Sequence, residues 1–227
     1  CAYLAPEHDV KSPIQSGVFV LLKNLISSSS KPFVALELLG CLSDTSKNVL
    51  EPLEDLWHRT DDTTTQLRIA RIYVALLRSV FGSDKGEESM HRLAEESAML
   101  STKLDAAYKH AEGKLCCPSV VKALCHLLCH SQQHTVLQNE GLLGLIFLIR
   151  STYADAFIAE TIFQVSSSPP RGMFACVMEA LLYIFGTAPA QVASNAYVLW
   201  LLLEKDERVS EWRARIEDAL SKCAHQM

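Results

Sequence analysis

The stretch LQNEGLLGLIFLIR, residues 137–150, decides the fold class of this chain of 227 residues. From Leu142 to Ile149 every residue is apolar or glycine, so two turns of a helix here would have no polar side. A helix of this kind must be buried on several sides at once. The stretch therefore predicts an inner helix of an all-α core, with other helices packed around it.

Three further segments follow the same pattern, in which a small residue near the start is followed by two apolar turns. These segments are 33–42, 66–79 and 193–206, and the small residues of the four segments are Ala35, Ala70, Gly141 and Ala196. The separation of the segments along the chain is irregular. The sequence therefore predicts a degenerate repeat of stacked helices rather than a regular one.

Loops rich in Ser, Asp, Gly and Pro divide the chain into helical segments, and no segment alternates apolar and polar residues as a strand does. The helical segments cover about 13–26, 32–42, 48–58, 64–81, 86–112, 118–130, 134–150, 153–165, 172–186, 189–204 and 206–224. We expect an all-α fold, a right-handed stack of antiparallel helix pairs with about ten or eleven helices.

The expected organisation is a single helical repeat domain over 1–227. N-terminal repeats cover 1–82, a long amphipathic helix lies within 83–115, and C-terminal repeats cover 116–227. The last segment, 206–224, has one apolar and one charged face, as expected for a helix that caps the end of a stack.

The stretch 137–151 resembles the last helix of an armadillo repeat, and the alternation of short and long helices is similar to that of HEAT repeats. The resemblance is one of format, carried by no single motif, and covers most of the chain except 83–115. It implies an ARM/HEAT-like α-solenoid that acts through protein partners. Armadillo proteins hold extended peptides with asparagines late in this helix, whereas here Asn139 and Asn195 fall early. The asparagine ladder of that family is therefore absent.

Composition argues against several classes of function. The net charge is −5, and a basic face that would neutralise nucleic-acid phosphates is missing, so we expect no nucleic-acid partner. The most apolar stretch, 172–188, is short for a bilayer and carries Glu179, so we expect no membrane insertion. Eight cysteines without a secretory signal, in a chain long enough to form a large core, indicate a reducing compartment, the cytoplasm or nucleus.

The stretch CHLLCHSQQH carries the residues most suited to chemistry, Cys125, His126, Cys129 and His130. On a helix the two histidines lie side by side, opposite the apolar face, and the two cysteines lie on its flank. Four ligands on one side of a helix cannot surround a tetrahedral ion, and a leucine stands where an H-E-x-x-H motif has its glutamate. We therefore expect a solvated helix edge, with no metal, cofactor or catalytic residue assigned.

The segment 87–114 differs from the other helices because its apolar residues form a narrow 3-4-3-4 seam. Two interpretations remain open: the seam is buried across the solenoid, or it contacts a partner or its own copy. The candidate partner-binding residues are Met90, Leu93, Leu100 and Leu104. We expect Leu100 and Leu104 to be buried and Met90 and Leu93 to be exposed.

The sequence as a whole favours a non-enzymatic protein–protein interaction scaffold, a module of a larger intracellular protein that binds helical or extended segments of other proteins or its own copy. The alternative is a metal-dependent helical domain or enzyme that uses the four Cys and His side chains of CHLLCHSQQH. Two weaker alternatives are a membrane hairpin at 172–203 and a scaffold in the machinery of meiotic DNA breaks. No sequence motif supports the second of these.

Overall fold

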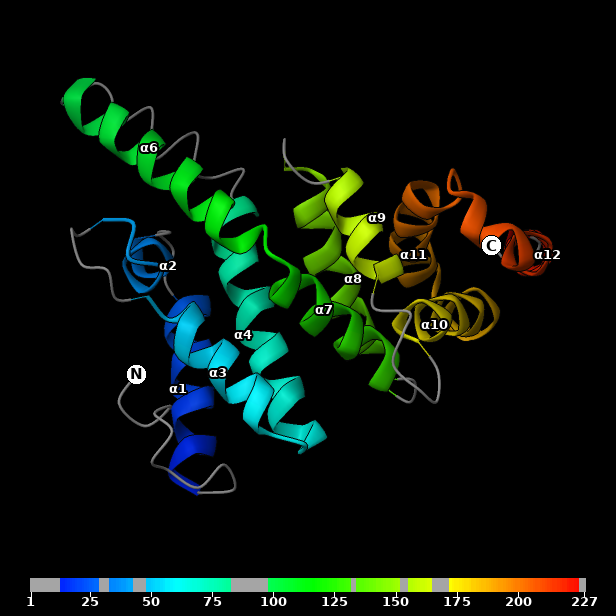
Figure 1. Ribbon diagram of the computed structural model, residues 1–227, viewed down its shortest axis with the longest axis horizontal. Helices are drawn as coiled ribbons and strands as arrows, with labels where there is room; N and C mark the ends of the chain where they lie inside the picture. The colour runs from blue at the N-terminus through cyan, green and yellow to red at the C-terminus, as the bar shows by residue number, and fades with distance from the viewer. Residues whose placement is uncertain are drawn as a thin grey trace. The chain divides into compact units, whose positions relative to one another are not determined.

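The computed structural model describes residues 13–28, 33–42, 48–82, 98–131, 134–151, 155–164 and 172–224. Within these ranges the chain is all-α, with eleven α-helices, one short 3-10 helix and no strand (Figure 1). The predicted class and number of helices are thereby confirmed. The contacts within the chain form two compact units, unit 1 (Cys1–Val120) and unit 2 (Val121–Met227), and each is described by itself.

Unit 1 is built around one central helix. Its helices are α1 (Pro13–Ser28), α2 (Phe33–Leu38), α3 (Leu50–Arg59), α4 (Thr63–Phe81) and α6 (Ala98–Leu115), followed by the first turn of α7 (Pro118–His130). The central helix α4 contacts α1, α2, α3 and α6. Its residues from Ile72 to Leu77 are all buried, which confirms the prediction of an inner helix within 66–79.

An aspartate fixes the start of α4. The Thr65 backbone N–H donates to Asp62 Oδ2 at 2.9 Å, and the Thr65 hydroxyl donates to the same oxygen at 2.6 Å. The first amides of a helix have no partner within the helix, and a capping side chain supplies one. The cap therefore defines where the central helix of unit 1 begins.

Unit 2 contains the rest of α7 and six further elements. These are α8 (Thr135–Ile149), α9 (Asp155–Gln164), α10 (Met173–Thr187), α11 (Ala190–Leu203), the 3-10 helix η3 (Glu207–Val209) and α12 (Ser210–Ala224). Helix α8 packs on α11, and α10 packs on α9, α11 and α12. Most predicted helix boundaries in both units agree with the structure within two residues.

Two glycines allow α8 to lie very close to α7. A Cβ atom at Gly141 would be 3.1 Å from the Leu124 carbonyl oxygen and 3.2 Å from the Leu128 backbone nitrogen. A Cβ atom at Gly144 would be 2.6 Å from a methyl group of Leu124. The small residue near the start of this apolar segment is therefore required by a close backbone approach.

Two predicted helices are shorter than expected. The helix expected over 32–42 ends at Leu38, because Gly40 adopts a φ of 63°, which a helix cannot continue. The segment 206–224 begins as the separate 3-10 helix η3, which Asp206 caps by accepting from the Arg208 backbone N–H. The helix expected over 86–112 is described from Ala98 onward, so its earlier part lies outside the described residues.

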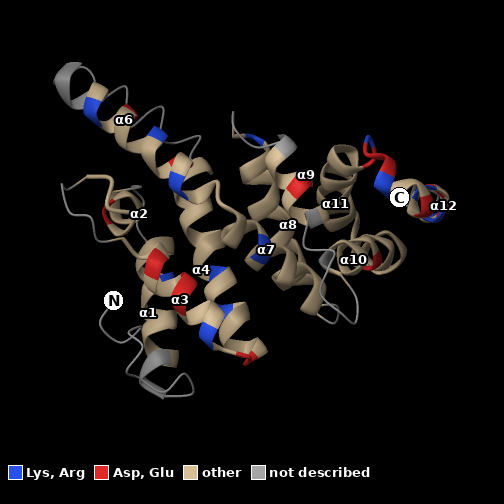
Figure 2. Cartoon of the chain, in the orientation of Figure 1, with Lys and Arg blue, Asp and Glu red and all other residues tan. Residues whose placement is uncertain are grey.

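An aromatic and charged cluster joins α9, α10 and η3 of unit 2. The Arg208 guanidinium lies 3.9 Å from the centre of the Phe163 ring and forms ion pairs with Glu160 at 3.1 Å and Asp206 at 2.8 Å. The centres of the Phe174 and Phe163 rings lie 4.8 Å apart. Figure 2 shows charged residues gathered on η3 and α12, whereas α11 shows none. In unit 2 the charged residues are therefore densest on η3 and α12, next to an α11 without charge.

Candidate functional site

The four Cys and His side chains of α7 are less exposed than the sequence indicates. The His126 and His130 rings do lie side by side, stacked with 4.0 Å between their centres. However, Cys125 is completely buried and His126 is half-buried rather than solvated. The expected solvated edge is wrong for these two residues, because the buried positions of α7 span an arc of about 200° at 100° per residue, wider than a single apolar face.

Burial also changes the acid–base chemistry of this part of α7. Burial, together with the smaller effect of the neighbouring His130, lowers the pKa of His126 to about 4. Burial raises the pKa of the Cys125 thiol to about 12 and raises that of Cys129 as well, with the nearby Cys176 adding to the effect. Thiolates, not thiols, bind metals and act as nucleophiles. These two cysteines are therefore held in the unreactive form.

A metal site built from such residues is not seen in the described part of the chain. Among the described residues, no group of three or more His, Cys, Asp or Glu side chains is arranged to hold an ion. In the same part of the chain, no helix is both long and apolar enough to cross a membrane.

The candidate seam of segment 87–114 is described only in its second half. Leu104 is 7% exposed, and Ala107, Ala111 and Leu115, which continue the seam, are buried as well. This half therefore belongs to the interior of unit 1, where α6 contacts α2 and α4. Met90, Leu93 and the side chain of Leu100 lie outside the described residues.

The end of α2 is locked against α6. The Cys41 backbone N–H donates to the Leu36 carbonyl at 2.8 Å, and the Gly40 N–H donates to that of Glu37 at 2.9 Å, the pattern of a Schellman motif. From α6, the Lys114 ammonium donates to the Leu39 carbonyl at 2.6 Å. The negative end of the helix dipole also stabilises a cation at this position. The turn after α2 is therefore held both by its own backbone hydrogen bonds and by a hydrogen bond from α6.

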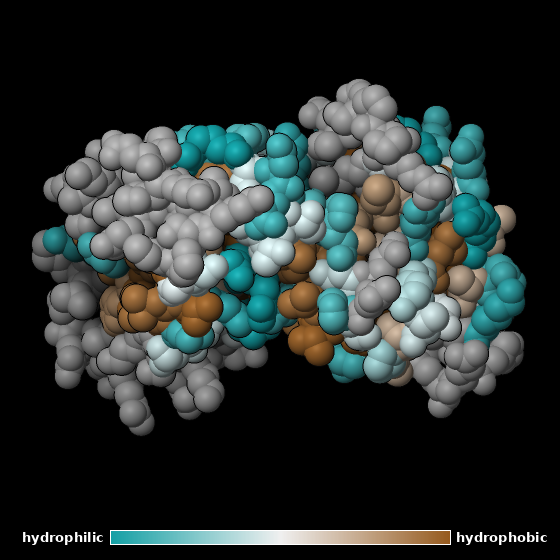
Figure 3. Space-filling view, turned by 90° about the horizontal axis from the view of Figure 1, so that it is seen from below, coloured by the Kyte–Doolittle hydropathy of each residue, from teal (hydrophilic) through white to brown (hydrophobic). Residues whose placement is uncertain are grey.

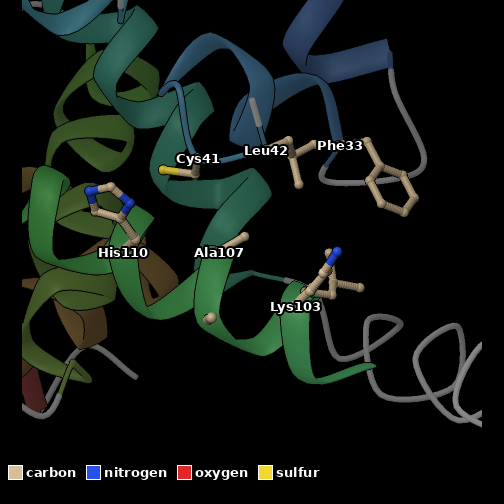
Figure 4. Close-up of a pocket in the computed structure, with 8 residues that line it drawn as sticks. Phe33, Cys41, Leu42, Lys103, Ala107 and His110 are labelled. Atoms are coloured by element: carbon tan, nitrogen blue, oxygen red, sulfur yellow. The ribbon is translucent and has the colours of Figure 1, made fainter. Parts of the chain in front are cut away.

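A pocket lies between this turn and α6. Its volume is about 540 Å³, and its lining consists of Phe33, Cys41, Leu42, Lys103, Leu104, Ala106, Ala107 and His110. In Figure 4, Leu42 and Cys41 lie across from Ala107, with Lys103 toward one end of the pocket and His110 toward the other. The sequence singled out only Leu104 among these residues. The spacing of Lys103, Ala107 and His110 on α6 indicates one wall, but the other wall depends on where α2 packs.

Large apolar side chains are exposed in groups of three on two of the described helices, and singly on α8 at Val136 and on α10 at Tyr183. On α1 these are Val20, Leu21 and Leu25. On α11 they are Tyr197, Val198 and Leu201, which are 43%, 38% and 39% exposed. Figure 3 shows hydrophobic surface, in brown, reaching the exterior of the described residues.

The exposure on α11 corrects an expectation. The segment 193–206 was expected to be buried on several sides, but only one side of α11 is, through Ala196, Leu199, Trp200 and Leu203. The neighbours α8, α9 and α10 contact the helix, yet within the described residues none covers the side with Tyr197 and Leu201. Apolar composition alone does not tell on how many sides a helix has neighbours.

Comparison with known proteins adds no assignment. No protein-family model matches the chain, and neither a curated protein nor a solved structure matches it.

Proposed function

We propose that this chain is a non-enzymatic protein-interaction module, and that its partner binds the α11 face, defined as Ser194, Tyr197, Val198 and Leu201. One observation carries the proposal: the 14 residues of α11 contain no charged residue, although this side of the helix is exposed. The outer side of a solvated helix ordinarily carries charged and polar residues. A side that is exposed, apolar and uncharged is typical of a protein-binding surface.

The spacing of the face indicates the kind of partner. Positions 194, 197, 198 and 201 follow the i, i+3, i+4, i+7 pattern by which two helices pack side by side. The face offers no charge to pair with, so the matching partner is a helix with an uncharged apolar stripe. Tyrosine is enriched among residues that dominate binding energy, and Tyr197 stands near the middle of the face.

The proposal includes an ARM/HEAT-like solenoid as the scaffold that presents this face. In support, α8 and α11, which contain the predicted inner helices of unit 2, pack against each other. The Asn195 side-chain amide donates to Asn139 Oδ1 at 2.8 Å, so the early asparagines of the two segments meet across this contact. These asparagines bond to each other and thus serve packing between helices rather than the holding of an extended peptide.

The test introduces charge into the face. The variant Val198→Asp/Leu201→Asp adds two carboxylates to exposed positions of α11. Its matched control, Ala214→Asp/Ser221→Asp, adds the same charge to exposed positions of α12. Surface substitutions change stability by less than about 0.5 kcal/mol, so both variants should keep the circular dichroism spectrum and melting temperature of the wild type.

Binding is measured with a photo-crosslinking amino acid in place of Tyr197, which is expected to give a discrete adduct with a partner in extracts of the source cells. The adduct should be lost with Val198→Asp/Leu201→Asp and retained with the α12 control. An adduct that survives the α11 substitutions, or one obtained equally from a crosslinker at Ala214, would show that the face does not bind the partner.

A further inference from the structure

The α2–α6 pocket of unit 1 has the composition of a small-molecule site. Its volume of about 540 Å³ is within the range of ligand pockets, roughly 300–1,000 Å³. Most of the lining is apolar, through Phe33, Leu42, Leu104 and two alanines. Such pockets characteristically combine apolar walls with a few polar groups that orient the ligand.

The polar groups stand at the two ends of the pocket. Lys103 and His110 are seven residues apart on α6, so their backbones are separated by about 10 Å along the helix axis at 1.5 Å per residue. Figure 4 shows Lys103 on the side of Phe33 and His110 on the side of Cys41, with Ala107 between them. The pocket therefore carries the positive charge of Lys103 at one end and an apolar floor, formed by Leu104 and Ala107, beyond it.

Among the described residues that line the pocket none is acidic, so none of them supplies a carboxylate to match the charge of Lys103. The other lysine near the turn, Lys114, is already bound to the Leu39 carbonyl. A ligand with a single negative charge at one end would complement Lys103, and its apolar part would cover Leu104 and Ala107.

We propose that the α2–α6 pocket binds a small amphiphile, an apolar chain of about eight carbons that ends in one carboxylate. The carboxylate pairs with Lys103, and the chain extends over Ala107 toward His110. The length follows from the geometry, because an extended chain advances about 3.5 Å per three bonds, and the seven C–C bonds and one C–O bond of an eight-carbon carboxylate therefore cover about 9–10 Å. This activity goes beyond the proposed interaction function and lies in a different unit from the α11 face.

The experiment titrates the full chain with octanoate and follows backbone amide signals by NMR. We expect saturable shifts at the residues that line the pocket, half-complete at roughly 1 mM or below. Octan-1-ol has the same chain without the charge and should bind more weakly, and octylamine should bind least. Butanoate, too short to reach past Ala107, should produce no saturable shift.

Three variants test the placement. Lys103→Glu should weaken octanoate binding roughly five- to tenfold and strengthen octylamine binding. Its matched control, Lys109→Glu, makes the same charge change at an exposed position of α6 outside the lining and should leave octanoate binding unchanged. Ala106→Trp fills the pocket from an exposed position and should abolish binding of all the probes.

The proposal fails if octanoate causes no saturable shift at 5-fold above the expected half-saturation, or if Ala106→Trp binds octanoate as the wild type does. Equal effects of Lys103→Glu and Lys109→Glu would also overturn it, because they would indicate attraction to the general charge of α6. If Ala106→Trp loses the wild-type circular dichroism spectrum, the comparison of the two lysine variants decides alone. None of these results bears on the α11 face.

Discussion

Substitution of Gly141 tests the close approach of α7 and α8. A methyl group at this position would lie 3.1 Å from the Leu124 carbonyl oxygen and 3.2 Å from the Leu128 nitrogen. Both are backbone atoms, so no side chain can rotate away, and α7 must shift as a whole. Overpacking of this kind costs about 1–3 kcal/mol.

Helix propensity acts in the opposite direction. Replacement of glycine by alanine inside a helix stabilises by about 1 kcal/mol. The net expectation for Gly141→Ala is therefore a loss of about 1 kcal/mol in the free energy of unfolding. Gly141→Val adds two more methyl groups and a β-branch, and the loss should rise to about 2–4 kcal/mol.

Gly186 in α10 provides the matched control within unit 2, because a Cβ atom there would have nothing within 4 Å. With no overpacking, Gly186→Ala should stabilise by up to about 1 kcal/mol. The measurement is urea denaturation followed by far-ultraviolet circular dichroism, with the slope compared between variants. If Gly141→Ala stabilises the protein as much as Gly186→Ala does, the close contact of α7 and α8 is refuted.

Three further predictions concern individual side chains. Asp62→Ala removes the cap from Thr65 and should cost about 1 kcal/mol in thermal unfolding, whereas Asp62→Asn, which keeps an acceptor, should cost less; equal losses would contradict the capping role. Cys125 and Cys129 should react with iodoacetamide at pH 8 far more slowly in the folded protein than in urea, because burial raises the pKa of both thiols. The reaction is followed by mass spectrometry of the labelled peptides, and fast labelling of the folded protein would contradict the prediction. The pKa of His126 is about 4 in the folded protein, against an ordinary value of 6.5, so between pH 6.5 and pH 4 the unfolded chain binds more protons than the folded one. The free energy of unfolding should therefore fall as the pH drops from 6.5 to 4, and His126→Gln should reduce that fall.

The helices themselves could be predicted because their signal is local. A few consecutive residues contain the whole pattern in both the apolar run of 137–150 and the start of α4, where Asp62 precedes three threonines. Such local patterns define both a helix and its end. The predicted bounds of α7, 118–130, coincide with the structure for this reason.

The distribution of neighbours could not be predicted, because it depends on tertiary packing. The sequence of α11 is as apolar as that of α8, yet the buried positions of α11 lie on one side, while those of α8 are spread over a wider arc. Likewise, Cys125 was placed at the flank of a single apolar face, whereas α7 is buried over a wider arc. The α2–α6 pocket was out of reach for the same reason, since Leu42 and Ala107 are brought together only by the packing of α2 on α6.

The bond from Lys114 to the end of α2 has a consequence for the order of folding. Helix α2 has six residues, too few to be stable alone, because the nucleation of a short helix is unfavourable. The lysine that fixes its last turn follows Leu39 by 75 residues in the chain. During synthesis, the hydrogen bond from Lys114 to the end of α2 can form only after α6 has left the ribosome. We therefore expect α2 to fold late, after α1 and α4 have paired.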